Sequence, residues 1–389
     1  MATGPEMPAL PDFDPGFSTA RMTATWSAAA RVKRMLEVEA ALIEAAADAG
    51  LVPRAAVVSI QAACDEGVAD PAALLAEGWK AGTPVVALLE VLRARVGADV
   101  KPYLQIGATS QDIIDTATVL MLRASFAAHC DTLGVLADAL HGLMTRHSDA
   151  WVMARTLLQP ALPFRFSVRV ARWLDPVLDR AEEALAASGA LPIQLGGPVG
   201  DLGSFGAGGE VVARRFAEIL HLSVPRLAWH TDRTVVVRAV NFATGVAAAS
   251  ASIAADLALL AQPEIGEIRM AAGVSSSIPH KRNPHHAVRS LAAARACQGA
   301  ATIVTAAHPH ELERAAGSWQ AEWFAVPLVM QTAAAALEAA VDAVTTATLD
   351  AERARANVGQ APQNDAASAD RLVERVASRY RQFRGRAAP

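Results

Sequence analysis

Residues 233–262 read RTVVVRAVNFATGVAAASASIAADLALLAQ, and this stretch decides the fold class. Alanine, leucine and valine recur along it at helical spacing, and the chain carries no charge between Arg238 and Asp256. A membrane span needs about 20 predominantly apolar residues, whereas this uncharged run is shorter and contains Asn241 and several hydroxyl side chains. We therefore expect a buried helix in a protein that does not span a membrane.

Further stretches of the same character predict an all-α protein. They are long, rich in alanine and sparsely charged on at least one face: 112–148, 164–189, 284–307 and 322–347. Helices that are apolar over most of their circumference are buried in a bundle or in an oligomer, and strand patterns are nearly absent. We expect a small helical N-terminal domain at 1–100, a long helix bundle at 101–347, and a reduced C-terminal domain of one helix and a tail at 348–389.

The composition excludes several classes of protein. Of the 389 residues, 52% are hydrophobic and 19% are charged, so a large core can form. The 35 basic and 39 acidic residues include no long basic run, so nucleic-acid binding is not expected. The scattered cysteines Cys64, Cys130 and Cys297 fit neither a disulfide framework nor a metal site, and the start MATGPEMPALPDFDPG does not resemble a signal peptide. We expect a cytoplasmic location.

Functional residues are expected in the irregular segments that interrupt the helical pattern, which we call breaks. The first break is 107–112, GATSQD. A glycine turn leads into a helix there, and Thr109 and Asp112 have the spacing of a capping box. Helix N-termini present free N–H groups and the positive end of the helix dipole. Thr109, Ser110 and Gln111 could therefore seat a carboxylate, or could only cap a long helix.

The second break is 155–160, RTLLQP. We expect Arg155, Thr156 and Gln159 at the head of the next long helix, where they could hold an anionic oxygen or could simply begin the helix. The third break, 195–206, is rich in glycine but lacks the preceding strand and the GK[ST] ending of a phosphate-binding loop. It predicts a connection between helices.

The fourth break, 273–284, reads GVSSSIPHKRNP and carries the most information. A loop of small residues can close over a ligand, and a serine beside cations and N–H groups could transfer a carbon-bound proton. Both flanks look buried, and burial of Lys281 and Arg282 would require anionic partners. The alternative is an exposed linker with solvated charges.

Histidines also cluster in this half of the chain, at His285 and His286 and in 308–311, HPHE. Neither cluster has HExxH spacing and no cysteine lies near, so no metal site is expected. His310 and Arg314 belong to a stretch that is dense in polar side chains, and they could point into a polar site.

The loop at 273–284 resembles the signature loop of the fumarase/aspartase superfamily. The usual form is GSSxMPxKxNP, and this chain has VSSSIPHKRNP, with Val274 for the glycine and Ile278 for the methionine. The first two breaks are similar to the TSxD and RTHxQ segments of the superfamily, in the same order. Leu157 stands where the superfamily frequently has a general-acid histidine.

Within the superfamily, several stretches are similar to the cycloisomerase branch of aromatic catabolism: 107–117, 194–202, 229–233 and 310–323. The resemblance implies a cytoplasmic homotetramer in which each active site uses segments of three chains. It implies a small polycarboxylate substrate, no cofactor and a place in the β-ketoadipate pathway. The implied reaction is the reversible lactonisation of 3-carboxy-cis,cis-muconate through an aci-carboxylate intermediate.

By this resemblance, Ser275 transfers the proton, and Lys281 and Asn283 hold the activating carboxylate. Further residues would bind the rest of the substrate: Thr109, Ser110, Gln111, Thr156, Gln159, Ser276, Arg282 and Arg314.

Two alternatives stay open. One is a lyase that eliminates an amine or another leaving group from a succinate-type substrate, as adenylosuccinate lyases do. Gln105 and Gln320, which stand at positions where relatives can have histidines, leave room for such a change of substrate. The other is a catalytically silent structural member, which would have little use for the serine loop.

Overall fold

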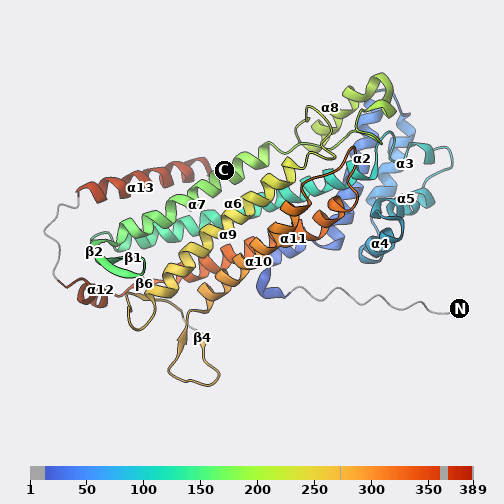
Figure 1. Ribbon diagram of the computed structural model, residues 1–389. Helices are drawn as coiled ribbons and strands as arrows, with labels where there is room; N and C mark the ends of the chain where they lie inside the picture. The colour runs from blue at the N-terminus through green and yellow to red at the C-terminus, as the bar shows by residue number, and fades with distance from the viewer. Residues whose placement is uncertain (1–13, 272, 360–366, 388–389) are drawn as a thin grey trace.

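The computed structural model describes residues 14–271, 273–359 and 367–387. It is an elongated bundle of long helices with a group of shorter helices at one end (Figure 1). Residues 1–13 of the expected N-terminal domain, and 360–366 and 388–389 of the expected C-terminal domain, lie outside the described residues.

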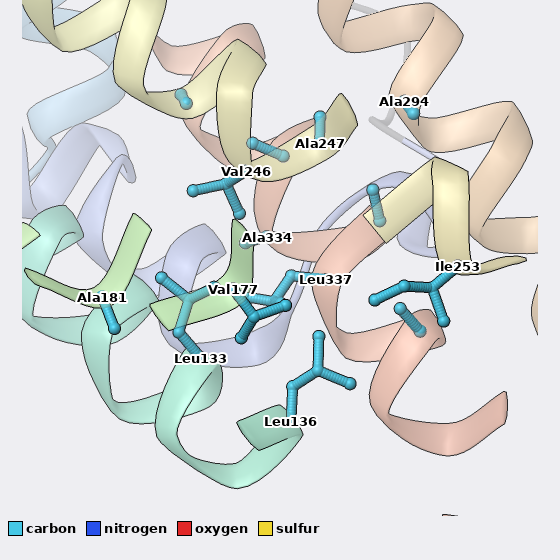
Figure 2. Packing of buried hydrophobic residues seen from close by; sticks show 14 of the residues in the cluster. Leu133, Leu136, Val177, Ala181, Val246, Ala247, Ile253, Ala294, Ala334 and Leu337 are labelled. Carbon is cyan, nitrogen blue, oxygen red and sulfur yellow. The ribbon is translucent and has the colours of Figure 1, made fainter. Parts of the chain in front are cut away.

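Long helices form the bundle, as the apolar stretches predicted, and their ends lie within a few residues of the expected ones: α6 Ser110–Arg146, α7 Phe166–Gly189, α9 Thr234–Leu260, α10 His285–Ala307 and α11 Ser318–Thr345. Their apolar side chains form one continuous core. Figure 2 shows its middle, where Leu133 of α6, Val177 of α7 and Val246 of α9 lie close to Leu337 of α11. Alanines such as Ala247 and Ala334 leave room for the helices to pack closely.

Shorter elements form the group at one end of the bundle: α2 Ala28–Asp48, α3 Arg54–Asp65, α4 Pro71–Gly78, η2 Trp79–Ala81, α5 Pro84–Arg95, η3 Lys101–Tyr103, η4 Gly203–Gly208 and α8 Gly209–Leu220. Two further short elements, η1 Pro15–Phe17 and α1 Ala20–Thr25, lie along the long helices instead, where Arg21 donates to Asp131 of α6 at 2.6 Å and Ser18 to Gln331 of α11 at 3.1 Å. Sequence signals set their ends. Gly50 follows α2 with φ 76°, and the Asp70 carboxylate caps α4 by accepting from Ala73 N at 3.0 Å. A second core lies here and includes the first turns of α6.

Short antiparallel strand pairs interrupt the helices. The strands are β1 Trp151–Thr156 with β2 Gln159–Arg165, β3 Ile268–Arg269 with β6 Thr348–Leu349, and β4 Gly273–Val274 with β5 Arg282–Asn283. The prediction that 155–160 heads a helix was therefore wrong, because α7 begins only at Phe166. Pro160 and Pro163 explain the difference, since proline is unfavourable inside a helix but is tolerated in an edge strand.

The C-terminal segment has more structure than the expected single helix and tail. After β6 it forms α12, Ala351–Val358, and α13, Ala367–Ala387. α13 lies along α7 (Figure 1), where Arg379 pairs with Asp175 at 2.7 Å and with Asp179 at 2.6 Å. Several exposed and half-exposed charges thus hold this helix to the bundle.

Three helices in the described part of the chain, α6, α9 and α11, are long and apolar enough to cross a membrane by length and composition. The bundle buries 67% of the most apolar window of α6 and of α11, but only 44% of that of α9. The predicted burial of 233–262 is therefore incomplete within a single chain.

Candidate functional site

The residues predicted for the site lie in three groups: the beginning of α6 together with Arg314, the β1–β2 hairpin, and the loop between β4 and β5. α6 has 37 residues and is therefore about 55 Å long. The hairpin follows the far end of α6, at the end of the bundle opposite to α2–α5 (Figure 1). One chain therefore cannot bring Thr109 and Thr156 to the same small substrate.

Asp112 organises the beginning of α6. Its carboxylate is 1% exposed and accepts from the backbone N–H groups of Thr109 at 2.9 Å, Gly196 at 3.0 Å and Gly197 at 2.9 Å. His230 Nε2 lies 2.7 Å from the same carboxylate. The expected capping pair of Thr109 and Asp112 is confirmed, and the carboxylate also holds a second loop against the helix.

That second loop is the glycine-rich third break. Gly197 has φ 75°, and a Cβ atom there would lie only 2.7 Å from the carbonyl oxygen of Gly107. The glycine therefore permits a close approach of two backbone segments. The connection predicted from the sequence is present, and it also fixes the shape of the first break.

A buried group of charges lies one turn further along α6. Arg233 donates to Asp115 at 2.7 and 3.0 Å and to Glu322 at 3.0, 3.2 and 2.6 Å. Arg233 and Asp115 are 1% and 2% exposed, and Trp319 Nε1 also donates to Asp115 at 2.9 Å. Burial raises the pKa of the Glu322 carboxyl, and Arg233 opposes that rise. Together these bonds join α6, α9 and α11.

Gln111 connects this framework to Arg314. Its amide nitrogen donates to the His230 carbonyl at 2.9 Å and to Asp115 at 3.2 Å, and its amide oxygen accepts from Arg314 Nε at 3.1 Å. The structure thus brings together Thr109, Ser110, Gln111 and Arg314 of the predicted set. Gln111 is 1% exposed, so its amide positions Arg314.

Another buried carboxylate supports the chain just before this site. Glu39 of α2 is 1% exposed, and its Oε2 accepts from the backbone N–H of Gln105 at 3.2 Å, where the backbone has φ 53°. Among the described residues, its Oε1 has no hydrogen-bond partner. Burial raises the pKa of Glu39 to about 7, against the opposing effects of the Gln105 bond and Arg93.

In the β1–β2 hairpin, Thr156 is opposite Gln159, and only Leu157 and Leu158 separate them. Arg155 Nη2 donates to Glu267 Oε1 at 2.8 Å, and this carboxylate is fully buried. Arg155 therefore already has an anionic partner within the chain. Arg155 thus anchors the hairpin to Glu267, and the structure does not support the interpretation that Arg155 holds a substrate oxygen.

The serine loop between β4 and β5 is open. Ser276, Lys281 and Arg282 are exposed, while Ser275 and Asn283 are half-buried. No ion pair within the described ranges involves Lys281 or Arg282, so the expected burial of these cations does not occur in a single chain. A pocket of about 1040 Å³ adjoins the loop, and Arg269, His280, Lys281 and Arg282 contribute to its lining. This basic pocket suits an anionic ligand.

Sequence reasoning assigned no role to several residues that hold the site together: Glu39, Asp115, Gln194 and Glu267. Gln194 links the glycine-rich loop to α6, because its backbone N–H donates to Thr116 Oγ1 at 2.9 Å. The available signal was the position of Gln111, Asp112 and Asp115 among the apolar residues at the beginning of α6, since buried charges require partners.

The fold and these loops define a class, the all-α lyases of the fumarase/aspartase superfamily. The family model for lyases matches residues 17–299, and the chain belongs to this family.

Among curated proteins, this chain is 36% identical to a 3-carboxy-cis,cis-muconate cycloisomerase of Bradyrhizobium diazoefficiens, over 88% of this chain and 78% of that protein. It is also 33% identical to a nitrosuccinate lyase of Streptomyces davaonensis, over 98% of this chain and 83% of that protein. Among solved structures, the 3-carboxy-cis,cis-muconate lactonizing enzyme of Pseudomonas putida superimposes with a TM-score of 0.83 at 33% identity, covering 97% of this chain and 87% of that one.

Proposed function

We propose that this protein catalyses the reversible cycloisomerisation of 3-carboxy-cis,cis-muconate in the β-ketoadipate pathway of aromatic catabolism. The observation that carries the proposal is the 36% identity to a cycloisomerase of this name over 88% of the chain. The loop VSSSIPHKRNP and the basic pocket beside it agree with a substrate of several carboxylates.

In this reaction, one substrate carboxylate adds across a double bond of the same molecule and forms a C–O bond, while a proton reaches the neighbouring carbon. The intermediate is an aci-carboxylate, which needs fixed donors and cations. We assign the proton transfer to Ser275, whose Oγ accepts from Ile278 N at 3.1 Å. This bond favours the anionic form of the oxygen. Lys281 and Asn283 then hold the activating carboxylate.

The other carboxylates would bind to residues on separate elements: Thr109, Ser110, Thr156, Gln159, Ser276, Arg282 and Arg314, with buried Gln111 holding Arg314 in place. In one chain, α6 separates the residues at its beginning from the β1–β2 hairpin by about 55 Å. We therefore propose a site assembled from three subunits of a cytoplasmic homotetramer. The incomplete burial of the α9 window supports this assembly. No electron transfer occurs in the reaction, so the mechanism uses no cofactor.

Purified protein mixed with 3-carboxymuconate tests the proposal. Loss of the conjugated-diene absorbance without release of fumarate is the expected result. The second candidate is a lyase acting on a substituted succinate, which the 33% identity to a nitrosuccinate lyase over 98% of this chain favours. Release of fumarate from an aminated or otherwise substituted succinate would establish that alternative, and no turnover of either substrate class would indicate a silent member.

A further inference from the structure

The turn of the β1–β2 hairpin consists of two leucines in an unfavourable conformation. Leu157 has φ 51° and Leu158 has φ 65°, both in the left-handed region. A two-residue hairpin turn with two positive φ values favours Asn-Gly, because a Cβ atom is strained there. The same leucines are 95% and 69% exposed.

Strain and exposure thus occur together at the turn, and nothing in the described chain compensates for either. Strained backbone concentrates at functional sites, and exposed apolar groups that lie together mark interaction sites. Leu162 of β2, which is 73% exposed but has no positive φ, lies on the same hairpin. It provides an internal comparison, since it is equally apolar and exposed but unstrained.

The neighbours of the turn indicate what it contacts. Thr156 and Gln159 are directly opposite each other in the ladder, and side chains of opposite residues in an antiparallel pair point to the same face. A carboxylate bound by these two side chains would therefore lie beside Leu157 and Leu158. The carbon chain attached to that carboxylate is the nearest apolar group that the leucines could cover.

We infer that Leu157 and Leu158 form an apolar wall against the conjugated carbon chain of the bound polyacid, in a site that other copies of this chain complete. This inference rests on the proposed function. Removal of water from beside the aci-carboxylate strengthens the hydrogen bonds and charges that stabilise it. Leucine has no titratable group, so the turn shapes the site and excludes water from it but does not transfer a proton.

The double variant Leu157→Asn, Leu158→Gly tests the inference, because it relieves the strain and removes the wall together. We expect the melting temperature to rise by about 1–3 °C. We expect kcat/KM for 3-carboxymuconate to fall at least about tenfold. Leu162→Asn is the matched control and keeps kcat/KM within about threefold, as does the double variant Leu157→Met, Leu158→Met, which restores an apolar surface.

An Asn-Gly variant as active as the wild type would overturn the inference, and so would an equal loss of activity in Leu162→Asn. Failure of the Asn-Gly variant to form the wild-type oligomer in size-exclusion chromatography would also overturn it, because the leucines would then serve assembly. Failure of the proposed function is distinguishable, since the wild-type protein itself would leave 3-carboxymuconate unchanged.

Discussion

The beginning of α6 and the serine loop are expected to bind the same substrate, but their surroundings within one chain are opposite. Around α6, Asp112 and Arg233 are each 1% exposed, and each has several hydrogen-bond partners. At the loop, Val274 at the end of β4 is 82% exposed, and the Ser275 hydroxyl accepts a hydrogen bond from Ile278 N. The first region is complete in the monomer, whereas the second is open.

This difference matches the separate roles that the two regions have in the proposed reaction. Groups that stabilise developing charge act best when they are fixed before the reaction begins. A group that must reach the substrate and then release the product benefits from a loop that can close and open. We therefore expect substitutions around α6 to change stability, and substitutions on the loop to change turnover.

The largest effect is expected from Arg233→Met. The substitution leaves Asp115 and Glu322 buried without their cation, which destabilises a protein by about 3–5 kcal/mol. Urea unfolding followed by circular dichroism measures the loss. Arg282→Met is the matched control on the serine loop, where the side chain is exposed, and it should change stability by less than about 0.5 kcal/mol. Equal shifts in the two variants would remove the distinction between the regions.

Ser275→Ala should have the next largest effect, on turnover alone. Loss of the proton-transferring hydroxyl should lower kcat by about 10² or more, the scale of general acid–base catalysis. The melting temperature should stay within about 1 °C of the wild type, because the one hydrogen bond that the half-buried hydroxyl makes in the described structure comes from Ile278 N of the same loop. Ser277→Ala, an exposed neighbour, is the control and should retain activity. Turnover by Ser275→Ala close to that of the wild type would exclude Ser275 from the mechanism.

The same contrast explains what could be predicted from the sequence. The long helices were predictable because their apolar periodicity is local, and the Thr109–Asp112 cap because its spacing is local. The partners of Arg233 were not predictable, since Asp115 and Glu322 come from distant helices and only folding brings them together. The hairpin at 151–165 was not predictable from its polar residues, which also suit a helix start, although Pro160 and Pro163 are unfavourable inside a helix. The loop was recognised from its motif, but its exposure depends on neighbours that a motif does not show.

The smallest expected effect is on the pH dependence of stability, and it tests the region at the beginning of α6 through Glu39. Burial raises its pKa from 4.5 to about 7 in the folded protein, so the folded state binds more protons than the unfolded state between those values. The contribution of Glu39 to the free energy of unfolding is therefore greatest below pH 4.5 and is lost as the pH rises to about 7.

Glu39→Gln removes this titration and still offers an acceptor to Gln105 N. The stability of the variant relative to the wild type should therefore rise between pH 4.5 and pH 8, by on the order of 2 kcal/mol. Urea unfolding at a series of pH values measures the difference. Glu44→Gln, at a half-buried position on the same helix, controls for loss of a carboxylate. A pH-independent difference for Glu39→Gln would mean that Glu39 is ionised in the folded protein throughout this range, and that the segment before Thr109 tolerates a buried charge.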